Sequence, residues 1–288
     1  MKRGSTWWTR PVWVRRILML SRLFRRFATT CPPAGRELGL LREHEDIAKR
    51  HARVHAAWAP HLAESRKTIL ETAGRCPQRR RALVIGAGDC LDVPVAGLAK
   101  LFGEIVLADI VTSAEVRRWE KKLRGRVCGV NWDASGALAT LAAVRETVTA
   151  GEAPEIFARA DPGPPPGGEA DFIVSANCIS QLGLVPGHSL PAQAKDKALP
   201  ERCAKAAAKR HLDWLKARPG VRLLLADAAR FDLSPDGKQL KKETLHERFG
   251  LPKPDRTWRW NLAPIPEWSP DFHRVHDVGA WVFQPTAP

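Results

Sequence analysis

Residues whose type and spacing could hold a ligand stand in a glycine turn near residue 86. Residues 82–89 read ALVIGAGD, so an apolar run leads directly into Gly86 and Gly88. Glycines are needed where a ligand comes close to the backbone, because a side chain would collide with it. A second apolar run ends at Asp109, and a carboxylate at that edge of a sheet accepts hydrogen bonds from both hydroxyls of a ribose. The turn and the acid together predict a nucleotide-type binding site.

Two kinds of ligand use such a turn, dinucleotides and S-adenosylmethionine. A dinucleotide site needs G-x-G-x-x-G or G-x-G-x-x-A, but the last position here is Leu91. Asp89 and Asp92 add negative charge that would repel a pyrophosphate. The cationic sulfonium of S-adenosylmethionine suits this acidic turn better, so we expect that cofactor.

The chain resembles the class I S-adenosylmethionine-dependent methyltransferases over residues 81–283. After the third predicted strand, residues 131–133 read NWD. At this point the family typically has a carboxylate that contacts the adenine amino group, with an apolar neighbour against the ring. The resemblance implies these roles for Asp133 and Trp132. The chain departs from the family where the usual acid before the first glycine is Val84 and the usual third glycine is Cys90.

The fourth predicted strand runs into residues 175–181, which read SANCISQ and correspond to the segment that faces the methyl group in the family. Asn177, Ser175, Gln181 and His188 are the polar residues expected to position an acceptor, and of these only His188 could take a proton near neutral pH. The same side chains could instead satisfy the backbone of their own loop. The predicted site has cofactor-binding residues Gly86, Gly88, Asp89, Asp109, Trp132, Asp133 and Ser175, catalytic residues Asn177 and His188, and no metal ligands.

From residue 81 onward, short apolar runs alternate with helical segments, as is typical of a parallel sheet covered on both faces. The predicted strands are residues 81–86, 104–109, 126–131, 171–176 and 221–227, and the predicted helices are residues 91–102, 113–122, 135–149 and 193–217. Two later stretches, residues 257–263 and 273–283, predict an antiparallel pair that closes the sheet. The expected fold is α/β, a doubly wound and mostly parallel seven-stranded sheet of the Rossmann-like methyltransferase type, with an N-terminal helical extension.

The 288 residues allow one large domain with side elements. We expect a basic amphipathic segment over residues 1–30, a helical lid over residues 31–79 that is interrupted near Pro60, and the methyltransferase-like α/β domain over residues 80–288. Four C-terminal tryptophans either line an acceptor pocket or cover the sheet: Trp258, Trp260, Trp268 and Trp281. The alternation of the first two puts both on one strand face.

The net charge of +15 is concentrated at the start of the chain, where residues 1–36 contain nine Lys and Arg and no acid. Residues 10–28 are predicted to form a basic amphipathic helix. Four interpretations stay open: an anchor on an anionic membrane surface, an organellar targeting peptide, an extension upstream of the true start, or a helix that packs on the core. The six cysteines form no C-x-x-C pair, which indicates a reduced, cytoplasmic setting, with peripheral attachment to the inner membrane under the first interpretation.

These observations predict S-adenosylmethionine-dependent methyl transfer to a small-molecule or lipid acceptor that the sequence does not identify. Two alternatives are a methyltransferase-like binding or scaffold protein without catalysis, and an NAD-dependent oxidoreductase. The chain lacks the N-P-P-Y or D-P-P-Y form of enzymes that methylate exocyclic nitrogens, and it has no cysteine in a Pro-Cys context. Base-directed DNA methylation is therefore disfavoured, and no specific nucleic-acid partner is expected.

Overall fold

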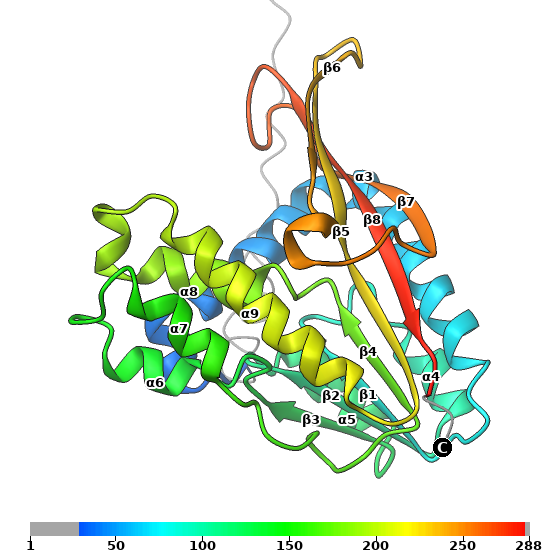
Figure 1. Cartoon of the computed structure of the whole chain (residues 1–288). Coiled ribbons are helices and arrows are strands. Elements are labelled where there is room, and N and C mark those ends of the chain that lie inside the picture. The colour runs from blue at the N-terminus through cyan, green and yellow to red at the C-terminus, as the bar shows by residue number, and fades with distance from the viewer. Residues whose placement is uncertain (1–28, 286–288) are drawn as a thin grey trace, which may run out of the picture.

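The computed structural model describes residues 29–285 (Figure 1). Nearly all of the predicted basic segment, including the whole of residues 10–28, lies outside these residues. Within the described part of the chain, no helix is long and apolar enough to cross a membrane.

The centre of the molecule is one eight-stranded sheet. Its strands are β1 (Arg81–Ile85), β2 (Glu104–Asp109), β3 (Val127–Asn131), β4 (Phe172–Ala176), β5 (Val221–Leu233), β6 (Gln239–Thr244), β7 (Arg256–Ala263) and β8 (His273–Phe283). The order is β3-β2-β1-β4-β5-β8-β7, with β6 paired to β5. Strands β1 to β5 are parallel, whereas β8 is antiparallel to both β5 and β7. This order with its antiparallel C-terminal hairpin is the class I methyltransferase fold, which confirms the predicted fold class.

The helices lie on both faces of the sheet (Figure 1). They are α2 (Pro33–Glu37), α3 (Leu40–Ala73), α4 (Val95–Leu101), α5 (Ala114–Lys122), α6 (Leu138–Ala143), α7 (Glu152–Arg159), α8 (Gln181–Ser189) and α9 (Leu199–Lys216). The single helix predicted over residues 135–149 is shorter, and α7 and α8 were not predicted. Both missed helices contain residues that weaken a helical pattern. α7 contains Pro154, and α8 contains Gly183, Pro186 and Gly187.

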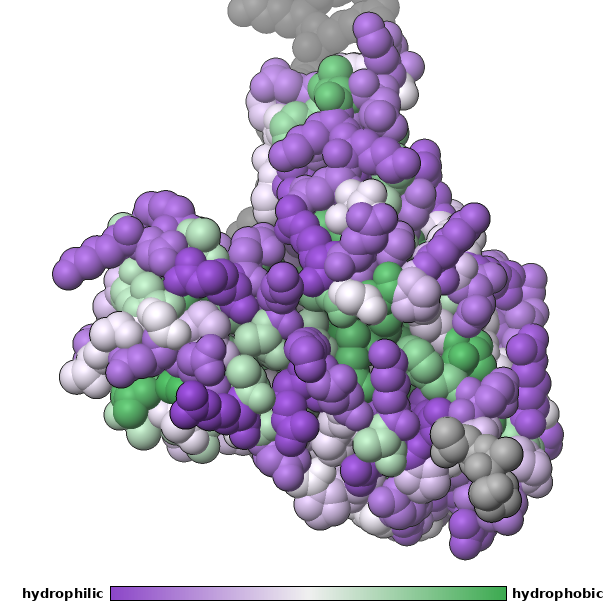
Figure 2. Space-filling model, in the orientation of Figure 1, coloured by the Kyte–Doolittle hydropathy of each residue, from purple (hydrophilic) through white to green (hydrophobic). Residues whose placement is uncertain are grey.

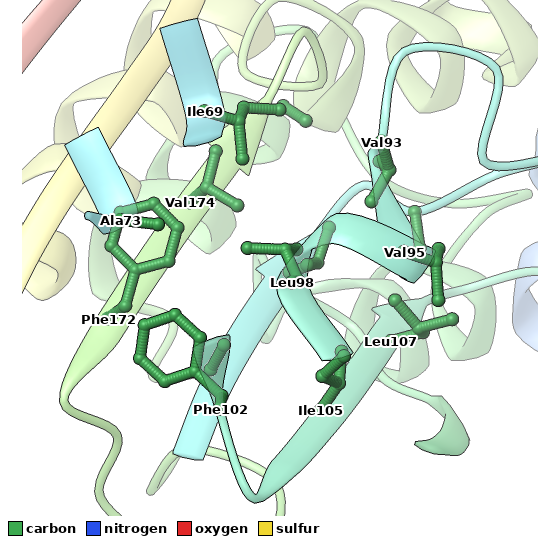
Figure 3. Packing of buried hydrophobic residues seen from close by; sticks show 14 of the residues in the cluster. Ile69, Ala73, Val93, Val95, Leu98, Phe102, Ile105, Leu107, Phe172 and Val174 are labelled. Atoms are coloured by element: carbon green, nitrogen blue, oxygen red, sulfur yellow. The ribbon is translucent and has the colours of Figure 1, made fainter. Parts of the chain in front are cut away.

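Alternate residues of the parallel strands are buried on opposite faces of the sheet. On β1, Ala82 and Val84 pack in the cluster covered by α3 and α4, whereas Leu83 and Ile85 pack in the cluster covered by α9. Figure 3 shows the first cluster, in which the rings of Phe102 and Phe172 stack with centroids 5.9 Å apart. Burial on both faces explains why these strands read as continuous apolar runs in the sequence.

Strand β5 continues beyond the body of the domain and forms a projecting arm with β6 and the start of β8 (Figure 1). Figure 2 shows that this arm is mostly hydrophilic. Within it, Arg274 makes two hydrogen bonds to the carboxylate of Asp232. Sequence analysis missed β6 because its residues read QLKKET and are largely exposed, so no apolar alternation marks the strand.

Helix α3 bends at Val54, whose φ and ψ are −118° and 26°. The interruption was predicted near Pro60, but the bend lies at Val54, before the proline. A proline ring clashes with the carbonyl four residues before it, so its effect falls on the preceding part of the helix. The C-terminal half of α3 packs on the sheet through Ile69 and Ala73. Its N-terminal half is tied to the loop between β7 and β8, where Glu267 lies between Arg50 and Arg53.

Candidate functional site

The site lies at the carboxyl ends of the parallel strands, where β1 has β2 on one side and β4 on the other. The connections leave β1 in opposite directions there, which opens a crevice in folds of this kind. A cavity of about 250 Å³ occupies this point, and a second of about 80 Å³ adjoins it. Both cavities are lined by Leu40, Gly86, Asp109, Ile110, Cys178 and Gln181. They therefore form one continuous cleft.

Both predicted glycines lie in this cleft, and each is required for a different reason. A Cβ on Gly86 would lie 2.7 Å from the Cβ of Cys178 and 2.8 Å from the carbonyl oxygen of Ala176, so this glycine lets β1 and the end of β4 approach. Gly88 has a φ of 48° and open space where its Cβ would be. Cys90 has a φ of 54° and donates its N–H to the carbonyl of Ala87, which keeps the turn left-handed where the family has a third glycine.

The segment after the turn differs from a dinucleotide site. Sequence analysis predicted a helix from residue 91, but α4 begins only at Val95. No helix N-terminus therefore meets the glycine turn, and a pyrophosphate would lack the N–H donors that normally bind it. Asp89 and Asp92 both line the larger cavity, so an anion would also meet two carboxylates. The NAD-dependent alternative does not fit this geometry.

Asp109 lies at the end of β2 and lines both cavities. One of its oxygens accepts the N–H of Gly88 and the other accepts the N–H of Val111, each at 2.9 Å. Burial raises the pKa of Asp109, and these two backbone hydrogen bonds act against the shift. The glycine turn thus fixes the carboxylate in place, and hydroxyl donors from a ribose would relieve the cost of its burial.

Trp132 and Asp133 line the smaller cavity, together with Ile85, Ala108 and Leu138. The indole N–H of Trp132 donates to the carbonyl of Pro162. The carboxylate of Asp133 accepts the N–H of Ser135 at 2.9 Å, the hydroxyl of Ser135 at 2.6 Å and the N–H of Leu138 at 2.8 Å. Both side chains are held rigidly beside an apolar slot, and the slot has the character that a flat adenine ring needs.

Asn177 lines the larger cavity at the end of β4. Its φ is 51°, and its side-chain amide donates a 2.6 Å hydrogen bond to Asp92. The predicted residues Asn177, Gly86, Gly88, Asp89 and Asp109 are therefore all brought to one cavity.

Two predicted residues lie elsewhere. Ser175 is fully buried, and its hydroxyl lies 2.9 Å from Nε2 of His211 on α9, because alternation along β4 turns this side chain into the core. His188 is exposed near the C-terminal end of α8 and lines neither cavity. Gln181 begins that helix inside the cleft, and His188 is seven residues or about 10 Å further along it. We correct both assignments: neither side chain lies where it could contact a cofactor or an acceptor in this cleft.

Sequence analysis missed an aromatic and histidine cluster that forms one wall of the larger cavity. His61 on α3 stacks on Trp260 of β7 with ring centroids 4.2 Å apart, and Nδ1 of His61 lies 3.0 Å from the indole nitrogen of Trp258. Because an indole nitrogen can only donate, Nδ1 of His61 accepts and its proton is on Nε2. Burial lowers the pKa of His61 to about 4, so the ring is neutral.

Asp227 lines the same cavity from β5, immediately before an irregularity in the pairing of β5 with β8. Nδ1 of His276 lies 3.0 Å from Oδ1 of Asp227. The two atoms are close enough for an ion pair but are not aligned for a hydrogen bond. Burial would raise the pKa of Asp227, but the neighbouring His276 lowers it below its usual value. A signal for Asp227 was present in the sequence, since it ends an apolar run as Asp109 does. His61 had none, because one histidine on a long helix follows no pattern.

Three of the four C-terminal tryptophans take one of the two predicted roles, and Trp268 takes neither. Trp258 and Trp260 share one strand face, as predicted, since both contact His61. Trp260 lines the larger cavity, Trp281 is buried in the core and Trp268 is exposed. Within residues 29–285, no group of three or more His, Cys, Asp or Glu is placed to hold a metal ion.

No protein-family model and no curated protein matches the chain. Among solved structures, the chain is similar to the 1,6-didemethyltoxoflavin-N1-methyltransferase of Burkholderia thailandensis, with 14% identity, coverage of 83% of this chain and 87% of that chain, and a TM-score of 0.39. A SAM-dependent methyltransferase of Leishmania major shares 15% identity over 78% of this chain and 73% of that chain, with a TM-score of 0.35. An amino pentose methyltransferase of Micromonospora echinaspora shares 12% identity over 77% of this chain and 91% of that chain, with a TM-score of 0.30. The assignment of the fold rests on the strand order of this chain, not on these similarities.

Proposed function

We propose that this chain binds S-adenosylmethionine in the cleft and transfers its methyl group to an acceptor. The observation that carries this proposal is the charge of the larger cavity. Its lining includes five carboxylates, those of Glu43, Asp89, Asp92, Asp109 and Asp227, in a chain whose net charge is +15. An acidic cavity attracts a cationic ligand and repels a phosphorylated one.

The two ends of the cleft suit the parts of this cofactor. The slot beside Trp132 and Asp133 suits adenine, and Asp109 suits the ribose hydroxyls. The open space over Gly88 leaves room for the methionine portion against the backbone. When bound, the cofactor supplies an electrophilic methyl carbon on a sulfonium. The protein's task is to hold the acceptor in line with that carbon and to exclude water, which together lower the barrier to displacement.

The acceptor is proposed to enter the end of the cavity that Asn177 and Trp260 line. The N-terminal half of α3 also lines this cavity, through Leu40, His44 and Ile47, and Trp58 and His61 beyond its bend lie beside Trp260. A small molecule or a lipid would reach the site past this helix. Attachment of the protein to the cytoplasmic face of an anionic membrane through residues 10–28 would favour a lipid, and co-sedimentation of the full chain with anionic vesicles, compared with a chain lacking residues 1–28, tests that attachment.

Isothermal titration of the full chain with S-adenosylmethionine and S-adenosylhomocysteine tests the proposal. We expect micromolar binding of both ligands, lost in Asp109→Ala and kept in Asp213→Asn. Asp213 is a matched control because it pairs with Lys209 on the exposed side of α9, outside the cleft. A folded protein that binds neither ligand would contradict the proposal.

A further inference from the structure

We propose that the acceptor is a basic amine, which binds as a cation at the end of the larger cavity between Asp92 and Asp227. This inference rests on the proposed function, because it names the substrate class of the same site. It concerns the wall of the larger cavity that Asp92, Asp227 and His61 line.

Asp92 and Asp227 together carry more negative charge than the basic groups around them offset. Asp92 is held by the neutral amide of Asn177. Asp227 has His276 on one side, and the nearby Arg230 is paired with Glu243. The other histidine of this wall, His61, is neutral because burial lowers its pKa to about 4. Of the two remaining basic groups in the lining, Arg50 lies 3.7 Å from Glu267, and His44 lies 3.6 Å from Asp89. A cationic ligand would therefore be favoured at this wall.

The same wall contains polar atoms that have no hydrogen-bond partner. His61 is only 2% exposed and lines the cavity. Its Nδ1 bonds Trp258, and its Nε2–H has no hydrogen bond to any residue in the described part of the chain. The indole nitrogen of Trp260 and Oδ1 of Asn177 are also buried without a hydrogen-bond partner within residues 29–285. Buried polar groups normally have partners, so these atoms indicate a polar ligand. Of the three, Oδ1 of Asn177 is the acceptor, and an ammonium N–H would donate to it. The N–H groups of His61 and Trp260 are donors and would need an acceptor elsewhere on the same ligand.

Two aromatic rings form part of this wall. Trp58 and Trp260 meet edge to face with ring centroids 5.0 Å apart, and both line the cavity. Aromatic rings beside carboxylates stabilise an alkylammonium group through charge and through cation–π contact. A neutral alcohol would gain neither contribution, and a carboxylate would be repelled.

The chemistry of transfer follows from this placement. An amine that arrives as R–NH3⁺ has no free electron pair, so one proton must leave before reaction. That proton passes to solvent water before the transfer. The nitrogen lone pair then forms the bond to the methyl carbon while the carbon–sulfur bond breaks and its electron pair stays on sulfur. The products are R–NH2⁺–CH3 and a neutral thioether, and one proton is released in total.

Two sources of such an amine share this chemistry, a soluble small molecule and the headgroup of a lipid. The test begins with the full chain saturated with S-adenosylhomocysteine and titrated with hexylamine or with 1-hexanol. We expect the amine to bind at least about tenfold more tightly than the alcohol, an effect typical of a desolvated charge pair. Transfer of labelled methyl from S-adenosylmethionine to soluble amines, or to vesicles of phosphatidylethanolamine in phosphatidylglycerol, then identifies the source.

Two variants test the assigned residues. Asp92→Asn and Asp227→Asn should each weaken hexylamine binding about tenfold, and by a larger factor than they weaken binding of S-adenosylhomocysteine, which lacks the sulfonium charge. The control Asp213→Asn should change neither. If the intact chain binds no S-adenosylhomocysteine, the proposed function itself fails. If it binds that ligand but binds amine and alcohol equally, or if both aspartate variants keep the amine preference, the amine assignment alone is overturned.

Discussion

The side-chain amide of Asn177, at the end of β4, donates a 2.6 Å hydrogen bond to Asp92 in the loop after the glycine turn. This bond joins the two segments that leave neighbouring parallel strands at the switch point. Asn177 makes it from a backbone conformation with a φ of 51°, which most residues avoid. Asparagine tolerates this conformation better than other non-glycine residues, so Asn177 provides both the turn conformation and the hydrogen bond.

Replacement of Asn177 separates these two contributions. Asn177→Gly keeps the turn but loses the hydrogen bond, and we expect it to lower the free energy of unfolding by about 1 kcal/mol. Asn177→Ala loses the bond and also strains the backbone, which should cost about 1 kcal/mol more. Urea unfolding of the three proteins measures both differences. Equal stability of the glycine and alanine variants would contradict the argument from backbone strain.

The two glycines of the turn should respond differently to alanine. In Gly86→Ala the new Cβ would meet the Cβ of Cys178 and the carbonyl of Ala176 at less than 3 Å, so we expect a loss of about 3 kcal/mol or more in unfolding free energy. Gly88→Ala meets no atom within 4 Å and should lose only about 1 kcal/mol through its positive φ. Its methyl group would instead enter the cleft, so cofactor affinity should fall more than stability. Thermal melts with titration of S-adenosylhomocysteine measure both effects.

The parts of this molecule that sequence analysis predicted are those with a local signal. Apolar runs marked the strands because both sheet faces are buried, and the ends of those runs placed Gly86, Asp109 and Asn177 in the site. Residues at the ends of parallel strands come together at the carboxyl edge of the sheet, independently of the conformation of the loops. Asp227 ends a run in the same way and could have been assigned a role from the sequence.

The missed wall of the cavity has no local signal. His61 enters the site because α3 crosses from the N-terminal extension to pack on β7, and Trp258 meets it nearly 200 residues later in the chain. Ser175 was assigned to the site because it ends a strand, but the alternation of side chains along β4 turns it toward His211. Only the packing of helices on the sheet decides such contacts.

The buried pair of Ser175 and His211 should make stability depend on pH. Burial lowers the pKa of His211 to about 4, although a hydrogen bond to the carbonyl of Ala134 acts in the opposite direction. The unfolded chain therefore binds a proton near pH 6.5 that the folded protein does not bind, so this stabilisation is complete above pH 6.5 and is lost as the pH falls toward 4. At pH 5 the loss should be about 2 kcal/mol.

The variant His211→Gln checks that expectation. Glutamine can still hydrogen-bond the hydroxyl of Ser175 but does not titrate, so its unfolding free energy should fall less than that of the native chain between pH 7 and pH 5. Urea unfolding at both pH values gives the comparison. A native chain and a variant that lose equal stability over this interval would show that His211 is not the titrating group.

The contact of Glu267 with α3 should control access to the cleft. Its carboxylate lies between Arg50 and Arg53 and is only 10% exposed, and Arg53 donates hydrogen bonds to both of its oxygens. Glu267→Gln removes the charge that attracts both arginines, and we expect it to lower the stability of this docking by about 1 kcal/mol. Hydrogen exchange of residues 40–53 should become several times faster, while exchange in β1 and β4 stays unchanged.

Glu45→Gln, an exposed position on the same helix, is the matched control for charge. If Glu267→Gln leaves the exchange of residues 40–53 unchanged, or if Glu45→Gln accelerates it as much, the ion pairs at Glu267 do not hold α3 over the cleft.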